Sequence, residues 1–309
     1  MDYMYHTTVS HIVSQSVWTW LPVLQPPRPV EPSDLPDPVQ VSRRGWRDFI
    51  ATQRREGNPD FFPWIHYVRR RDGPGDDQLA ARVYGEIQQL QAGGARIIPR
   101  FSTGFPPALR RIADPPALLV CVGNPSLLRQ EGVAIVGSRK ASRPALQASA
   151  RAGLMLARAG RPVISGGALG CDIAAHAGVL HSGQRPAPAV VVQAGGLAGL
   201  YPRRNKPVFD EILAAGGCLI SERLWKAPCR PMDFPVRNRI VSGMVGTVLV
   251  MQSAPRSGAM VTARLALDQG REILVYRHAS GDVRGDGNRQ LMEEGAESFT
   301  TVEPGGFLP

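Results

Sequence analysis

Residues 133–170 have the sequence VAIVGSRKASRPALQASARAGLMLARAGRPVISGGALG, and this stretch decides the fold. It begins with the apolar run VAIVG and ends just after a second one, PVIS. Between the two runs, Leu146, Ala150 and Leu154 recur at four-residue spacing, as on one face of a helix. The pattern predicts a strand, a crossover helix and a second strand that is parallel to the first.

Further apolar runs of the same kind follow along the chain. Six strands are predicted in total, at 133–137, 162–167, 189–196, 217–222, 247–253 and 271–276. Near-continuous apolar runs are typical of parallel strands that are covered on both faces. Helical spacing returns in AMVTARLALDQG, where Met260, Ala263 and Leu267 share a face. This alternation predicts an α/β protein with a doubly wound, mostly parallel sheet and right-handed crossovers.

The chain before the sheet differs in composition. Residues 22–38 contain seven prolines in seventeen positions, which predicts an extended linker. Four apolar residues of QLAARVYGEIQQLQ fall on one helical face: Leu79, Val83, Ile87 and Leu90. Three parts are therefore expected: an N-terminal segment with the linker (1–40), a small helical or irregular region (41–94) and the sheet domain (95–305).

The overall composition excludes several classes of protein. With 43% hydrophobic and 20% charged residues, the chain is not wholly disordered, collagen-like or coiled coil. No apolar stretch approaches the roughly 18–20 residues of a membrane span, and MDYMYHTTVS lacks the layout of a signal peptide. We expect a soluble, cytoplasmic protein without membrane contact. The cysteines at 121, 171, 218 and 229 are too far apart for a zinc motif, so we expect reduced, mostly buried thiols and no metal or cofactor.

The charge of the chain favours a polyanionic partner. The formal net charge is +10, and residues 133–309 hold 21 Lys or Arg against 13 Asp or Glu. A basic face gains free energy by releasing counterions from phosphates. Because ligands of open parallel sheets collect at the carboxyl ends of the strands, the residues that follow each strand are the candidates for this contact.

Cations and helix starts follow the predicted strands. After the first strand come Ser138, Arg139 and Lys140, and then Ser142 as a predicted N-cap. The glycine-rich turn after the second strand is neither a dinucleotide fingerprint nor a P-loop. The other loops bring further candidates: Ser165, Gly166, Gly170 and Asp172; Tyr201, Arg203, Arg204 and Lys206; Arg237, Asn238 and Arg239; Ser257, Gly258 and Thr262. Cations in several loops at one edge suit a phosphate backbone better than one small ligand.

Structural roles compete with binding at several of these positions. Asp172 and His176 share a helical face, and a hydrogen bond that orients the loop is favoured over a catalytic or metal pair, because no further ligand completes a metal shell. Arg237 and Arg239 could instead form salt bridges to Asp233 or Glu222. No base lies near Ser138 or Ser257 in the sequence, so neither is predicted to be a nucleophile.

The loops at the strand ends resemble those of the DNA-processing protein A family, also called DprA or Smf. The similar segments are RFSTGFPPALRRIADPPALLVCVGNPSLL, VAIVGSRKAS, VISGGALGCDIAAH, GGLAGLYPRRN, GGCLISE, FPVRNRIVSG and SGAMVTARLALDQGREI, in that order, over about residues 95–300. The resemblance implies an extended Rossmann-like domain and a homodimer without catalytic turnover. It also implies a protein that binds single-stranded DNA with little sequence preference and hands it to the RecA recombinase in natural transformation.

The resemblance assigns the DNA contact to specific residues. It implies a pocket made by Arg139 of the GSR turn, the loop from Ser165 and Gly166 to Asp172, and the cations around Tyr201. The other elements that it carries over are Arg237, Asn238 and Arg239 as the RNR element, and Ser257, Gly258 and Thr262 as a second glycine turn.

The chain departs from the family pattern at Gln252, Arg277, His278 and Arg289. A neutral Gln252 in place of the usual glutamate, with two added arginines, predicts a more basic rim. The departures also leave open a nucleotide sensor or a nucleotide-processing enzyme such as a phosphoribohydrolase, although the Pro-Gly-Gly-x-Gly-Thr turn of those enzymes is missing.

Overall fold

The computed structural model describes residues 85–100, 102–278, 282–303 and 306–308. The predictions for residues 1–84, including the linker and the helical positions Leu79 and Val83, lie outside the described residues. Residues 85–92 are helical, and their buried side chains Ile87 and Leu90 belong to the same core as Ala95 at the start of the sheet. This helix therefore packs directly on the sheet domain.

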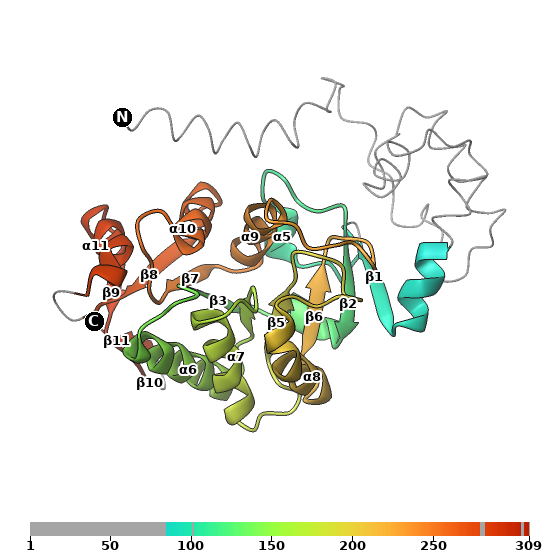
Figure 1. Cartoon of the computed structure of the whole chain (residues 1–309), viewed down its shortest axis with the longest axis horizontal. Helices are drawn as coiled ribbons and strands as arrows, with labels where there is room; N and C mark the ends of the chain where they lie inside the picture. Colours follow the sequence, from blue (N-terminus) through green and yellow to red (C-terminus); the bar gives the residue numbers. More distant parts are fainter. Residues whose placement is uncertain (1–84, 101, 279–281, 304–305, 309) are drawn as a thin grey trace, which may run out of the picture.

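The described residues form one nine-stranded sheet and a two-stranded hairpin (Figure 1). The order in the large sheet is β1-β2-β6-β5-β4-β3-β7-β8-β9. The strands are β1 (Ala95–Pro99), β2 (Leu118–Gly123), β3 (Val133–Val136), β4 (Val163–Ser165), β5 (Ala189–Val192), β6 (Cys218–Ser221), β7 (Thr247–Val250), β8 (Glu272–Tyr276) and β9 (Glu297–Phe299), with β10 (Thr301–Glu303) and β11 (Gly306–Leu308) in the hairpin.

All six predicted strands are present, as β3 to β8, and they pair in parallel. This result confirms the doubly wound α/β fold. The sequence did not predict the flanking strands: β1 and β2 pair antiparallel next to β6, whereas β9 extends the other edge in parallel.

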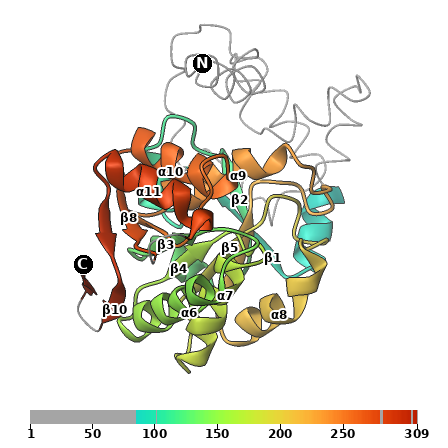
Figure 2. The same cartoon turned by 60° about the vertical axis from the view of Figure 1, so that its left-hand side comes forward.

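Helices cover both faces of the sheet. The longer helices are α6 (Arg143–Arg158), α7 (Cys171–His181), α8 (Lys206–Ala214), α9 (Asp233–Gly243), α10 (Gly258–Asp268) and α11 (Asp286–Glu293), and α5 (Pro107–Arg110) is a single turn. Helices α6, α7 and α8 lie on one face, and α9, α10 and α11 on the other, in both views (Figures 1 and 2). None of the helices in the described residues is long and apolar enough to cross a membrane.

The strand side chains alternate between two apolar cores. In β3, Val133 and Ile135 join the core under α6 and α7, whereas Ala134 and Val136 join the core under α9 and α10. The central strands β3, β4, β5 and β6 are thus buried on both faces, which explains the continuous apolar runs in the sequence.

Local signals fix where two helices begin. The Ser142 hydroxyl accepts the Ala145 N–H at 3.4 Å at the start of α6, as predicted, and Ser257 accepts the Met260 N–H at 3.4 Å at the start of α10. Both caps lie just after parallel strands, so the open N–H groups of both helices face the carboxyl edge of the sheet.

The strand order reverses beside β3. The chain runs outward through β4, β5 and β6, then returns to pair β7 with the other side of β3. Such a reversal separates the loops that follow the two innermost strands and opens a crevice between them.

Candidate nucleic-acid interface

A groove with a cavity volume of about 460 Å³ lies at this strand reversal. It is lined by ten of the predicted site residues: Ser138, Arg139, Lys140, Gly166, Asp172, Arg237, Asn238, Ser257, Gly258 and Thr262. The topology alone brings together the loops after β3, β4 and β7 with the side of α9.

The loop after β3 supplies the two exposed cations of the groove, Arg139 and Lys140. The Arg139 guanidinium carbon lies 4.9 Å from the centroid of the Phe234 ring, within cation–π range. Among the described residues, Arg139 has no carboxylate partner. The Ser138 hydroxyl accepts the Lys140 N–H at 3.1 Å and so shapes the turn between the two cations.

Arg237 is the buried cation of the groove, with a side chain that is held by backbone carbonyls. Its Nη1 donates to Gly166 O at 2.8 Å and to Val192 O, and its Nε donates to Asn238 Oδ1 at 3.2 Å. Burial lowers the pKa of Arg237, while Asp172 opposes this shift. A side chain at Gly166 would collide with this guanidinium, which explains the glycine.

Asp172 lies at the bottom of the groove and stabilises the loop after β4. Its Oδ2 accepts the Ala168 N–H at 3.3 Å. Burial raises the pKa of Asp172, and Arg237 and the backbone N–H groups limit the rise. Asp172 and His176 do not form a pair: both ring nitrogens of His176 are buried without a hydrogen-bond partner. The favoured interpretation, a hydrogen bond that orients the loop and not a catalytic or metal pair, is confirmed for Asp172. His176 takes no part in that bond.

The start of α10 forms the opposite wall. Thr262 Oγ1 and Asn238 Nδ2 both donate to Gly258 O, at 3.0 and 3.4 Å. The Asn238 bond ties α9 to α10, whereas the Thr262 bond lies within α10. Ser257, Gly258 and Ala259 line the groove, so the N-terminus of α10 lies where it can bind an anion.

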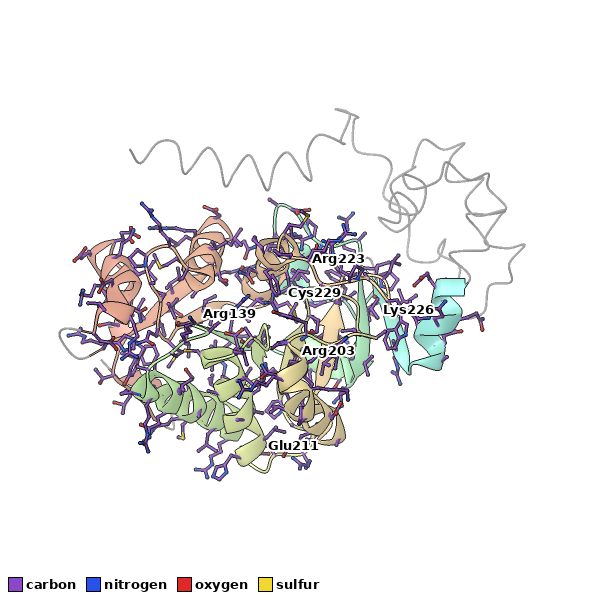
Figure 3. All side chains as sticks on the ribbon, in the orientation of Figure 1. Arg139, Arg203, Glu211, Arg223, Lys226 and Cys229 are labelled. Carbon is purple, nitrogen blue, oxygen red and sulfur yellow. The ribbon has the colours of Figure 1, made fainter. Side chains whose placement is uncertain are left out.

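A smaller hollow of about 30 Å³ continues the groove toward the loop after β5. Tyr201 and Phe234 line it, with ring centroids 5.6 Å apart and planes at 57°. Arg139 and Cys229, which are both labelled in Figure 3, also line it. Leu169, which is 37% exposed, and Tyr201, which is 45% exposed, leave apolar surface on its rim. Cationic and aromatic surfaces are thus continuous here.

The remaining predicted residues lie outside both cavities. Ser165 is buried and donates to Ile135 O at 2.6 Å, and Gly170 caps α7 with φ of +84° beside the Ser138 carbonyl. Arg203 and Arg204 are exposed on the loop beyond Tyr201, and Lys206 is paired with Asp210 at 2.6 Å.

Arg239 is not part of the groove. It is buried, and its guanidinium binds Asp114 at 2.9 Å and Glu222 at 2.7 Å. Asp233, the other proposed partner, pairs with Arg223 instead. The salt-bridge alternative with Glu222 therefore holds for Arg239, whereas Arg237 faces the groove.

The departures from the family pattern do not make the rim more basic. Gln252 is fully buried, Arg277 binds the Ser298 hydroxyl, and Arg289 pairs with Asp286; none of the three lines the groove. The two arginines add no charge to the lining of the groove, because Arg277 is exposed beside β9 and Arg289 lies on α11.

Sequence reasoning missed Phe234, which contacts Arg139 and Tyr201 and lies in both cavities. Its position three residues before Arg237, at the start of a helix, was the available signal, since such residues share a helical face. Within the part of the chain that the structure describes, no cluster of three metal-ligating side chains occurs.

The fold and the groove define a class: a doubly wound α/β protein with a cationic, aromatic-edged binding groove at its topological switch point. The comparison with known families identifies the class further. A family model for DNA recombination-mediator protein A matches residues 96–304. The chain belongs to this family.

Known relatives agree with this assignment. The chain is 32% identical over 220 residues to protein Smf of Borreliella burgdorferi, covering 71% of this chain and 68% of the relative. It is 35% identical over 214 residues to protein Smf of Escherichia coli, covering 69% and 56%. It is 33% identical over 240 residues to DNA processing protein DprA of Bacillus subtilis, covering 74% and 80%. The chain thus spans little more than half of the E. coli relative.

Two solved structures share the fold. DNA processing protein A from Streptococcus pneumoniae superposes with a TM-score of 0.64 at 25% identity, covering 85% of this chain and 92% of that one. The protein from Helicobacter pylori superposes with a TM-score of 0.59 at 30% identity, covering 66% and 90%, and its description concerns a single-stranded DNA binding mode.

Proposed function

We propose that this protein binds single-stranded DNA with little sequence preference and acts by capture, without making or breaking bonds. One observation carries the proposal: Arg139, Lys140 and the start of α10 line one groove, and that groove continues into a hollow edged by Tyr201 and Phe234. Cations and helix N-termini bind phosphates, and aromatic rings stack bases of any sequence.

The arrangement favours a strand over a duplex. Bases of a duplex are stacked on each other and cannot reach Phe234, which lies beside Arg139 inside the groove. A single strand can expose its bases to the rings while its backbone stays on the cations. Preference for single strands is therefore part of the proposal.

The family membership supports the wider role. We infer that the protein protects strands in the cytoplasm and transfers them to the RecA recombinase during recombination or natural transformation, as a homodimer without catalytic turnover. The solved structure of the H. pylori protein, which concerns a single-stranded DNA binding mode, supports the choice of ligand. The transfer itself is tested by RecA filament formation on protein-bound strands.

The decisive experiment is fluorescence anisotropy of a labelled poly-dT oligonucleotide and of a matched duplex, with salt varied from about 50 to about 300 mM. We expect tight single-strand binding that weakens steeply with salt, and weaker duplex binding. Equal affinity for both, or single-strand affinity that does not change with salt, would contradict the proposal.

A mononucleotide sensor or nucleotide-processing enzyme is the second candidate, because the cavity volume of about 460 Å³ also suits a small ligand. It predicts saturable binding of a nucleoside monophosphate that excludes poly-dT, or release of free base. Gln252, where the family pattern has an acid, is buried and offers no carboxylate to such chemistry.

A further inference from the structure

Gln252 holds both ends of the loop that carries Arg139 and Lys140. Its backbone carbonyl accepts the Ser138 N–H at 2.7 Å. Its side-chain Oε1 accepts the Ser142 N–H at 2.8 Å, and its Nε2 donates to Ser142 Oγ at 3.1 Å. Gln252, two residues after β7, thus holds Ser138 and Ser142, the residues at the start and the end of the cationic loop.

The side chain of Gln252 has a further partner outside this loop. Its Nε2 also donates to Asp282 Oδ2 at 3.0 Å. Asp282 precedes the short 3₁₀ helix η4 (Val283–Gly285) and accepts the Arg284 N–H at 3.2 Å, as its N-cap. Gln252 is fully buried, and both of its polar side-chain atoms are bonded. The amide therefore links the groove loop to the segment before α11.

We propose that Gln252 is a positioning residue for the DNA groove, and that its amide is matched to the carboxylate of Asp282. The inference rests on the proposed function, because the loop that Gln252 holds carries the two exposed cations of the groove. Gln252 itself does not line the groove, so it acts through the loop and not by touching the strand.

The contacts explain why an amide and not a carboxylate stands at residue 252. A glutamate could still accept the Ser142 N–H, and the Ser142 hydroxyl could turn to donate to its second oxygen. Asp282 is the partner that distinguishes glutamine from glutamate at residue 252. Gln252 donates an N–H to the Asp282 carboxylate, whereas a glutamate would place a second carboxylate against it. Two like charges at this separation repel, even though Asp282 is only half-buried.

The other charged groups at Asp282 do not remove this conflict. Arg284 Nε lies 3.0 Å from Asp282 Oδ1, and His278 Nδ1 lies 4.0 Å from Oδ2. The Arg284 contact lowers the pKa of Asp282, which keeps it ionised. Burial lowers the pKa of His278, which keeps its ring neutral. Oδ2 thus presents a negative charge to residue 252 at neutral pH.

The test exchanges the two partners. Gln252→Glu alone should weaken binding of poly-dT by at least about tenfold, the size of one lost charge-assisted contact. Gln252→Glu combined with Asp282→Asn restores an amide–carboxylate pair with the roles reversed, and should bind within about threefold of wild type. Asp282→Asn alone keeps an acceptor for Gln252 and serves as the control. Wild-type affinity of Gln252→Glu, or a double variant as weak as the single one, would overturn the proposal.

Hydrogen exchange at the Ser142 amide gives a readout that does not depend on DNA. This amide should be protected in wild type, exchange at least about tenfold faster in Gln252→Glu and regain protection in the double variant. If wild type fails to bind DNA, the proposed function fails, but the order of exchange rates still decides the role of Gln252. If Gln252→Glu does not fold, a folded double variant with wild-type affinity supports the pairing, and a folded double variant without affinity refutes it.

Discussion

Arg139→Ala should weaken single-strand binding through the loss of one phosphate contact. Arg139 is exposed in the groove, and among the residues that the structure describes it has no carboxylate that would neutralise it. A hydrogen bond to a charged group contributes about 1.5–3 kcal/mol, so we expect a loss of at least about tenfold at low salt. The assay is anisotropy of a labelled poly-dT oligonucleotide.

The salt dependence gives the sharper number. For single strands, each phosphate contact contributes a slope of about −0.7 to the plot of log affinity against log salt. Raising salt fourfold, from about 50 to about 200 mM, therefore weakens each contact by about 2.6-fold. The deficit of Arg139→Ala relative to wild type should shrink by that factor over the same range.

Arg158→Ala provides the matched control. Arg158 is exposed in the last turn of α6, while the groove is lined by the loop that precedes the first turn of that helix. Removing the same charge there should leave both affinity and slope near their wild-type values. If the two variants behave alike, the effect is one of net charge, and the reasoning from the groove is refuted.

Three further variants probe other parts of the structure. Tyr201→Ala and Phe234→Ala should each lower poly-dT affinity by about 1–3 kcal/mol. The salt slope should not change, because stacking releases no counterions, and a changed slope would argue against stacking. Tyr201→Phe keeps the ring and should bind like wild type. Arg239→Ala should lower the free energy of unfolding by about 3–5 kcal/mol in urea denaturation, because Asp114 and Glu222 lose their partner, whereas Arg203→Ala should leave stability unchanged. Burial lowers the pKa of His176 to about 4 in the folded chain, whereas the ordinary pKa of histidine is about 6.5. Between these two pH values, the unfolded chain protonates His176 and the folded chain does not. Stability should therefore fall by about 3 kcal/mol as the pH drops from about 6.5 to about 4, and His176→Leu, measured over the same range, should lose this part of the pH dependence.

The central sheet could be predicted because burial on both faces leaves a direct mark on the sequence. The runs VAIV and VLV have no polar residue, and they lie in β3 and β7. The edge strands lack this mark: β9 has only three residues, and only two of the five residues of β1 are buried. Their place depends on pairing with distant strands, which a local pattern does not contain.

The candidate site was predictable to the level of loops but not of side chains. Parallel strands end at one edge, so the loops after β3, β4 and β7 had to converge. Side-chain direction is a different matter, as Arg237 and Arg239 show. Two residues apart on a helix means about 200° of rotation, so both could not face the groove. Which of the two did so depended on the carboxylates Asp114 and Glu222, which come from other parts of the chain.

The burial of the cysteines has a practical consequence. Cys121, Cys171 and Cys218 are buried, and only Cys229, in the hollow beside Arg139, is half-buried. The sequence has no other cysteine. A maleimide dye should therefore attach to the native chain at a single place, and the emission of that dye would report arrival of a ligand without any engineered mutation.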